Sequence, residues 1–181
     1  MNVKERLSIR AKRIDNGAWV EGFLFALSYT GGHSWCIGNA PLSPNDYSEL
    51  YGLDRDWFYI DPATICQSTG LHDSTRWEEL TCEEQKQFLL ELNFERDRRN
   101  TKEDWHGKLI FEGDILAAHL DDDNPDDVTY AQVIWDDNSW NIQEQGSFDL
   151  HLLDEDVQND YKVVGNIFDN PELVELLEEE V

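Results

Sequence analysis

The chain has 181 residues, of which 40% are hydrophobic and 12% aromatic, so it can build the core of one domain or two small ones, and its composition excludes an intrinsically disordered acidic chain. Its formal net charge is −25, from 39 acidic and 14 basic side chains. Three cysteines without a C-x-x-C spacing argue against a disulfide framework and against a thiolate zinc site.

The negative charge belongs to the C-terminal part of the chain. Residues 1–60 carry six basic and seven acidic side chains, whereas residues 111–181 carry one basic side chain, Lys162, and 21 acidic ones. Such a segment repels nucleic acid and anionic lipid, so we expect no direct nucleic acid through the acidic face and no membrane. The expected partners are basic protein surfaces, and a homo-oligomer stays open.

The N-terminal stretch MNVKERLSIRAKR is charged and has no apolar segment of a secretory signal, and no run approaches the roughly 18 apolar residues of a membrane span. We therefore expect a cytoplasmic protein. Within this stretch Leu7, Ile9 and Ala11 alternate with polar neighbours, and AWVEGFLFAL follows after Asn16-Gly17. The pattern predicts a hairpin, because Asn-Gly tolerates positive φ in tight turns.

The next segment, residues 30–56, is rich in Gly, Pro, Asn and Asp and predicts a long loop around one short strand at HSWCIG. WFYIDPATICQ then predicts two short strands broken at Pro62.

The stretch TCEEQKQFLLELNFERDRRN predicts one long helix over residues 82–99. Phe88, Leu89 and Leu92 share one face at helical spacing, so an exposed apolar stripe here would dock a partner or a second copy.

Both ends of this helix carry the expected signals. Thr81 and Glu84 have the spacing of a capping box. Arg96, Arg98 and Arg99 would meet the negative end of the helix dipole.

From residue 108 onward, short apolar runs separated by Asp, Asn and Gly predict a small antiparallel barrel or a strongly bent sheet. The runs are KLIFEGDILAAHL, VTYAQVIWDD, SWNIQE, SFDLHLL and YKVVGNIF. Asn170 and Pro171 open a final short helix. The fold class is therefore α+β, mainly β, with three segments: a β-rich region over 1–76, an inserted helix over 77–104, and an acidic barrel-like region over 105–181.

Five stretches between about residue 8 and residue 176 stand out together: RAKRIDNGAWVEGFL, WFYIDPATICQSTGLHD, GKLIFEGDIL, QVIWDD and VVGNIFDNPELVE. In these motifs and in their order, the chain resembles the YopX family of phage and prophage proteins. The resemblance implies an SH3-like barrel in the C-terminal part and, as location, the cytoplasm of a bacterial host cell. It supplies no catalytic residues. This chain departs from the family by about thirty inserted residues, from STRW to TKEDW, which contain the expected helix.

One of these motifs has a structural interpretation of its own. In FEGDIL, Gly113 can supply a backbone angle that other residues reach only at a cost, and Asp114 can cap a turn before the next strand.

No metal or cofactor site is expected. The acidic run DDDNPDD lacks the Gly and the terminal Glu of a calcium loop, and the chain has no G-x-S-x-G, P-loop or G-x-G-x-x-G motif. Enzyme activity is less favoured than binding. If the chain is an enzyme, a metal-dependent nuclease for RNA or DNA is the alternative, and its catalytic residues would be Asp114, His119, Asp136 and Asp149.

Phosphate mimicry needs none of those motifs, because a surface with many carboxylates can occupy a groove built for a nucleic-acid backbone. The candidate partner-binding residues are Asp121, Asp122, Asp123, Asp126, Asp127, Asp136, Asp137, Asp154, Glu155 and Asp156. The alternative interpretation is that acidic loops keep the protein soluble and block pairing at strand edges. The leading hypothesis is a phage or prophage accessory protein that binds a basic surface of a host protein. In its specific form, the protein is a DNA mimic of the anti-CRISPR or anti-restriction type, which inhibits a defence nuclease of the host. A structural or regulatory interaction module is the third hypothesis.

Overall fold

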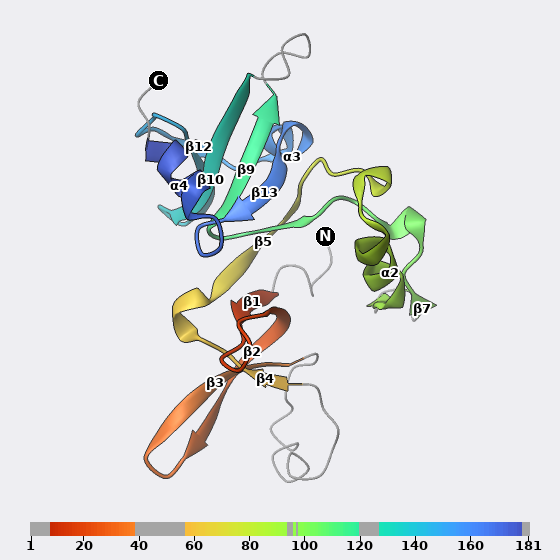
Figure 1. The fold of residues 1–181 in the computed structure, drawn as a ribbon, viewed down its shortest axis with the longest axis vertical. Helices are drawn as coiled ribbons and strands as arrows, with labels where there is room; N and C mark the ends of the chain where they lie inside the picture. The colour runs from red at the N-terminus through yellow and green to blue at the C-terminus, as the bar shows by residue number, and fades with distance from the viewer. Residues whose placement is uncertain (1–7, 39–56, 94–95, 97, 120–126, 179–181) are drawn as a thin grey trace. The chain divides into compact units, whose positions relative to one another are not determined.

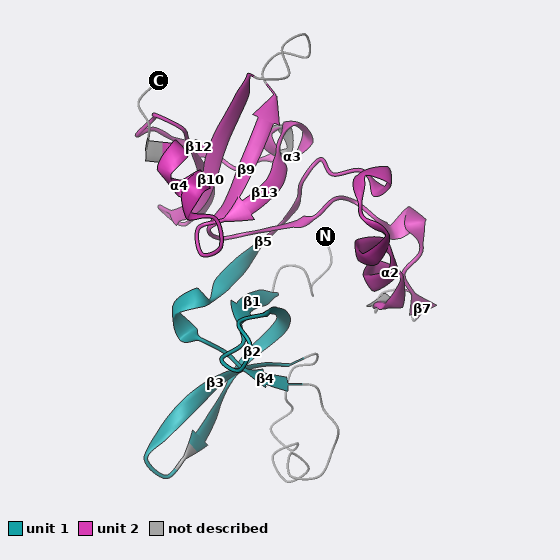
Figure 2. Cartoon of the chain, in the orientation of Figure 1, with its two compact units in different colours: residues 1, 3–68 teal, residues 2, 69–181 magenta. Residues whose placement is uncertain are grey.

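The computed structural model describes the chain except residues 1–7, 39–56, 94–95, 97, 120–126 and 179–181 (Figure 1). The chain divides into two compact units, residues 3–68 (unit 1) and residues 69–181 (unit 2), which are coloured separately in Figure 2. The boundary falls inside one strand, β5 (Cys66–His72). The three-segment division expected from the sequence stays a prediction.

Unit 1 is an antiparallel sheet in which the strands follow the order β4-β3-β2-β1-β5. Its other elements are β1 (Ile9–Lys12), β2 (Trp19–Tyr29), β3 (Gly32–Gly38), β4 (Trp57–Tyr59) and the 3-10 turn η2 (Pro62–Thr64). The short strands expected on either side of Pro62 are therefore confirmed. The short strand expected at HSWCIG is confirmed as β3, which pairs with β2 along its whole length.

The expected first hairpin is confirmed in residue detail. β1 and β2 pair antiparallel, with Ile9 opposite Gly22 and Lys12 opposite Trp19. Gly17 in the turn has φ +71°, and the Asn16 side chain accepts a hydrogen bond from the Ala18 N–H at 3.0 Å. Glycine and asparagine thus supply the conformation and the local hydrogen bond that the turn requires.

The core of unit 1 is small. Ala11, Ile37 and Ile60 are buried together, and partly buried side chains from β2 and β3 pack against them. Cys36 and Cys66 are buried free thiols, and burial raises the pKa of the Cys36 thiol to about 11.

Unit 2 contains a five-stranded antiparallel sheet in the order β12-β11-β10-β9-β13, as expected for a mainly β C-terminal region. The strands are β9 (Asp114–His119), β10 (Val128–Asp136), β11 (Ser139–Glu144), β12 (Leu150–Leu152) and β13 (Lys162–Asn166). A register shift between Val163 and Gly165 marks a bulge in β13. Closure of this sheet into an SH3-like barrel stays a prediction.

Apart from the inserted segment, one further strand and two helices of unit 2 lie outside the five-stranded sheet. β8 (Leu109–Phe111) pairs with β5, and the helices are α3 (Glu155–Asp160) and α4 (Pro171–Glu178). The final helix expected from Asn170 and Pro171 is confirmed. The Asn170 side chain accepts a hydrogen bond from the Asn166 N–H at 3.1 Å and so links the helix start to β13.

The hydrophobic core of unit 2 follows the alternation along the central strands. Leu116 and Ala118 of β9 lie on the same face as Ala131 and Val133 of β10 and Ile142 of β11. Successive strand residues point to opposite faces, so this face buries its apolar side chains while the neighbouring residues point away. Ile110, Leu153 and Tyr161 complete the buried cluster.

The FEGDIL motif is a turn, as expected from its residues. Gly113 has φ +75°, and the fully buried Asp114 accepts a hydrogen bond from the Phe111 N–H at 2.8 Å. The carboxylate therefore holds the turn between β8 and β9.

The helix in the inserted segment is shorter than the sequence predicts. It contains the 3-10 turns η3 (Trp77–Glu79) and η4 (Lys102–Asp104), the helix α2 (Cys82–Leu90), and a two-stranded hairpin of β6 (Leu92–Asn93) and β7 (Arg98–Arg99). The prediction of one helix over residues 82–99 was therefore wrong beyond Leu90. The capping box at its start, formed by Thr81 and Glu84, is confirmed.

Side chains that come back from the hairpin explain where the helix ends. Glu91 is extended, Arg99 donates a hydrogen bond to the Leu90 carbonyl, and Asn100 donates to the Phe88 carbonyl at 3.2 Å. These donors replace the N–H groups of a further helical turn, so helix residues beyond Leu90 are not needed to satisfy the terminal carbonyls. Arg98 pairs instead with Asp104.

Candidate partner-binding surface

The predicted acidic residues that the structure describes do not form one cluster. Asp127 is exposed immediately before β10, and Asp136 and Asp137 are exposed where β10 ends. A strand of this length spans about 26 Å, so these positions lie at opposite ends of the sheet. Asp121, Asp122, Asp123 and Asp126 lie outside the described residues.

Several of the predicted acidic residues lie at the end of β10 where the hairpin to β11 begins. Asp137 and Asn138 have φ +45° and +62°, which makes them the two central residues of a tight turn between β10 and β11. Asp154 follows β12, and because Leu153 donates its N–H to the Trp140 carbonyl, the register places Asp154 beside the start of β11. Three of the predicted residues therefore share this end, while Glu155 and Asp156 begin α3.

An exposed indole lies next to these carboxylates. Trp135 is 48% exposed and packs edge-on against Trp140, its cross-strand neighbour, with ring centroids 4.8 Å apart. Tryptophan beside carboxylates offers both apolar area and charge to a partner.

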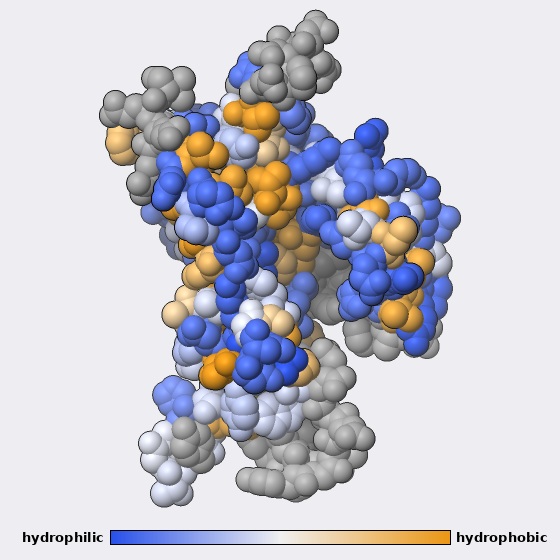
Figure 3. All heavy atoms as spheres, viewed as in Figure 1, coloured by the Kyte–Doolittle hydropathy of each residue, from blue (hydrophilic) through white to orange (hydrophobic). Residues whose placement is uncertain are grey.

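The outer strand β12 is apolar and exposed, which the sequence reasoning missed. Leu150 and Leu152 are 39% and 57% exposed and alternate along β12, so both point to one face of the strand. Phe148, which is 94% exposed, lies two residues before the strand begins. β12 ends the hydrogen-bonded order of the sheet and pairs only with β11 among the described strands. The alternation in SFDLHLL was the signal available in the sequence, and we call these three residues the β12 apolar row. In the space-filling view, apolar residues show on unit 2 among hydrophilic ones (Figure 3).

The candidate nuclease residues are distributed along the sheet. Asp114 and His119 begin and end β9, about 17 Å apart, and Asp114 is fully buried in its turn. Asp136 ends β10 on the side away from His119, and Asp149 precedes β12, with β10 and β11 lying between that strand and β9. Across the part of the chain that the structure describes, no three His, Cys, Asp or Glu side chains are placed to hold a metal ion.

The apolar side of α2 is divided between burial and exposure. Phe88 is partly buried between Trp77 and Trp105, at centroid distances of 5.9 and 5.1 Å. Leu89 and Leu90 are exposed. The helix thus uses its aromatic residue to hold the inserted segment together.

The eight basic side chains of unit 2 are all engaged by residues 78–104. Most of them form ion pairs: Arg76 and Lys162 with Glu79, Lys86 with Glu83, Arg96 and Arg98 with Asp104, Lys102 with Glu78, and Lys108 with Glu84. Arg99 binds the Leu90 carbonyl. The basic side chains of unit 2 are therefore bound by groups of the inserted segment. The 21 acidic side chains after residue 110 keep their excess negative charge.

These pairs depress the pKa of the carboxyls that receive them. The Arg76 N–H, followed by the Lys162 ammonium, lowers the pKa of Glu79 to about 2. The Arg98 guanidinium lowers the pKa of Asp104. In the opposite direction, burial and a 2.8 Å hydrogen bond to Glu144 raise the pKa of Tyr161.

The class of protein defined by this unit is an acidic, antiparallel β protein with an exposed apolar edge strand. Residues 102–175 match the family described as YopX protein, which supports the resemblance for that part of the chain. The match begins at η4 and ends within α4, so it contains the whole five-stranded sheet and leaves out α2. No curated protein matches the chain. None of the helices in the described part of the chain is long and apolar enough to cross a membrane.

Proposed function

We propose that this protein acts by binding another protein, and that the β12 apolar row and the acidic residues near it make the contact. The observation that carries the proposal is the exposure of Leu150 and Leu152 on an outer strand, with the exposed Phe148 just before it. An outer strand offers unpaired N–H and C=O groups, and a partner strand can add to it by main-chain hydrogen bonds while pockets receive alternate side chains.

The alternative interpretation is that acidic residues here only prevent edge pairing. A blocked edge carries its charges on the strand itself. On β12 the exposed leucines of the row are apolar, and the carboxylates of Asp149 and Asp154 lie just outside the two ends of the strand. This arrangement resembles an interface, with an apolar centre and a charged rim, more than a protected edge.

The partner surface is basic in this proposal. Residues 111–181 carry 21 acidic side chains and one basic one, so a basic partner is attracted at long range and an acidic one, including a second copy of this chain, is repelled. In its specific form, the protein is a phage or prophage accessory protein that occupies the nucleic-acid site of a host defence nuclease. The resemblance to the YopX family and the charge support this form.

The test begins with a pull-down from bacterial lysate and continues with the purified partner. Its affinity is measured by calorimetry for the wild type, for Leu150→Ser with Leu152→Ser, and for Asp136→Lys with Asp137→Lys and Asp154→Lys. We expect about a tenfold loss or more for the double serine variant, and for the lysine variant weaker binding that depends less on salt.

Two substitutions on α2 serve as matched controls. Leu90→Ser removes an equally exposed leucine, and Glu83→Lys reverses an exposed carboxylate, both outside the proposed surface. Wild-type affinity in the double serine variant would refute the role of the β12 apolar row. Wild-type affinity and salt dependence in the triple lysine variant would refute the electrostatic part.

A further inference from the structure

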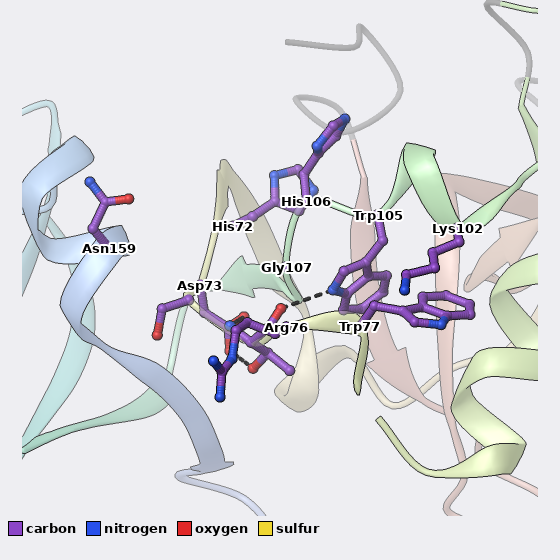
Figure 4. Close-up of a pocket in the computed structure, with 11 residues that line it drawn as sticks. His72, Asp73, Arg76, Trp77, Lys102, Trp105, His106, Gly107 and Asn159 are labelled. Atoms are coloured by element: carbon purple, nitrogen blue, oxygen red, sulfur yellow. Dashed lines mark hydrogen bonds between the residues drawn. The ribbon is translucent and has the colours of Figure 1, made fainter. Parts of the chain in front are cut away.

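A second site, independent of the β12 apolar row, lies where the inserted segment joins the sheet of unit 2. It is a hollow of about 690 Å³, lined by residues 72–77, Lys102, residues 105–107 and Asn159 of α3 (Figure 4). Cavities that bind small molecules commonly measure about 300–1,000 Å³. The hollow is thus large enough for a metabolite.

The lining of this hollow carries several nitrogen groups. It includes Arg76 and Lys102 and the imidazoles of His72 and His106, with Asp73 as its one acidic residue. Arg76 and Lys102 form ion pairs with Glu79 and Glu78, so an anionic ligand would compete with these two carboxylates for the cations.

The single carboxylate is already used within the protein. One oxygen of Asp73 accepts hydrogen bonds from the N–H groups of Lys108 and Thr75, at 2.8 and 2.9 Å. The other accepts from the Val163 N–H and the Thr75 hydroxyl, both at 2.8 Å. Because both oxygens are satisfied, Asp73 holds the wall of the hollow and does not neutralise its cations.

One wall is aromatic and fixed in place. Trp77 and Trp105 lie with ring centroids 6.2 Å apart, and Phe88 packs against both. The Trp105 indole N–H donates to the Thr75 carbonyl at 2.9 Å, the bond drawn in Figure 4. A planar ring can stack on such a surface, for about 1–3 kcal/mol in the case of a nucleic-acid base.

The cations keep donors for a ligand. Glu79 takes the Nε and Nη2 groups of Arg76 and leaves its Nη1 group outside this pair. Lys102 pairs with Glu78 at 2.6 Å, and both side chains are more than half exposed. Exposed pairs of this kind contribute little, so an anion can compete for the ammonium group.

We propose that this hollow binds a free nucleoside monophosphate, with the base against Trp77 or Trp105 and the phosphate near the Arg76 guanidinium. A small ligand fits better than a nucleic-acid strand, because a polyanion would meet the repulsion of the acidic sheet. The inference does not depend on the proposed protein partner.

The test is a titration of the full chain with AMP, GMP, CMP and UMP, followed by two-dimensional NMR of the tryptophan indole N–H groups and by calorimetry. We expect binding of at least one nucleotide at about 1 mM or tighter, with shifts of the Trp77 and Trp105 signals. Inorganic phosphate and the free nucleoside should each bind at least about tenfold more weakly, since each makes only part of the contacts.

Two variants sharpen the result. Arg76→Gln should weaken binding about tenfold, whereas Lys86→Gln, which removes a cation from the same unit away from the hollow, should leave it unchanged. Failure of all four nucleotides to shift either tryptophan would overturn the proposal. Equal weakening by both variants, affinity for phosphate equal to that for the nucleotide, or tighter binding of a single-stranded oligonucleotide would also overturn it.

Discussion

The carboxylate of Asp73 accepts a hydrogen bond at 2.8 Å from the backbone N–H of Val163, which lies 90 residues later in the chain. The same carboxylate also binds the N–H groups of Thr75 and Lys108. Asp73 is 4% exposed, so water does not compete for these bonds. One side chain therefore joins the start of the inserted segment, the approach to β8, and β13.

Replacement of Asp73 by Asn should destabilise unit 2. The amide puts an NH₂ group where one carboxylate oxygen accepts two hydrogen bonds, so donors would face donors in a buried place. We expect a loss of about 3 kcal/mol in the free energy of unfolding, because the lost bonds are charge-assisted and buried donors are left unsatisfied. Urea unfolding followed by circular dichroism measures it.

Asp61→Asn is the matched control for this prediction. Asp61 makes the same local bond, accepting the Ala63 N–H two residues on at 3.0 Å, but it is exposed at the start of η2. Asparagine serves this position about as well as aspartate, so the change should stay below about 0.5 kcal/mol. Equal losses in the two variants would show that the buried bonds of Asp73 contribute nothing of their own.

Gly107→Ala should be among the most damaging substitutions in the chain. A Cβ atom at Gly107 would lie 2.0 Å from the Asp73 carbonyl oxygen, and the residue has φ +110°. Gly31 offers a control with nearly the same φ, +107°, and open space around the added atom. Backbone strain is common to both, so the collision accounts for the difference. We expect about 3 kcal/mol or more for Gly107→Ala and about 1–2 kcal/mol for Gly31→Ala, from thermal unfolding of each variant.

Acid should remove the contribution of Glu84. The Thr81 hydroxyl and N–H and the Lys108 ammonium lower the pKa of this carboxyl from 4.5 to about 2. A carboxyl with a depressed folded pKa stabilises the protein above its unfolded pKa and loses that effect as the pH falls through the folded pKa. The difference in Tm between wild type and Glu84→Gln should therefore be largest above pH 5 and vanish near pH 2.

The glutamine variant keeps the capping geometry, so the measured difference isolates the charge. Glu83→Gln, which alters an exposed carboxylate on the same helical turn 3.6 Å from Lys86, should have no measurable effect at any pH. A Glu84→Gln difference that persists unchanged at pH 2 would contradict the electrostatic explanation.

Local sequence signals predicted local structure well. Asn16-Gly17 gave the hairpin, and Thr81 with Glu84 gave the helix start, because each depends on residues a few positions apart. The end of α2 depends on Arg99 and Asn100, whose side chains return to the helix from a separate hairpin. A periodicity over residues 82–99 contains no information about that return.

The candidate partner-binding surface also has features that the sequence predicted and features that depend on the fold. The acidic excess was evident in the composition, and the alternation that produces the β12 apolar row was present in SFDLHLL. That Leu150 and Leu152 are exposed depends on β12 lying at the edge of the sheet, which is a property of the strand order. Likewise the role of Asp73 has no local sequence signal, since its bonds to Lys108 and Val163 join positions far apart in sequence.

Two of the three cysteines provide a way to test whether the two units unfold separately. Cys36 is buried in unit 1, while Cys82 is exposed at the start of α2 in unit 2. In the native protein Cys82 should react with a thiol reagent at once and Cys36 only after unfolding, as mass spectrometry of labelled peptides would show. In Gly107→Ala, which damages unit 2, Cys36 should keep the protection it has in the wild type. Rapid labelling of Cys36 in that variant would mean instead that the two units unfold as one cooperative structure.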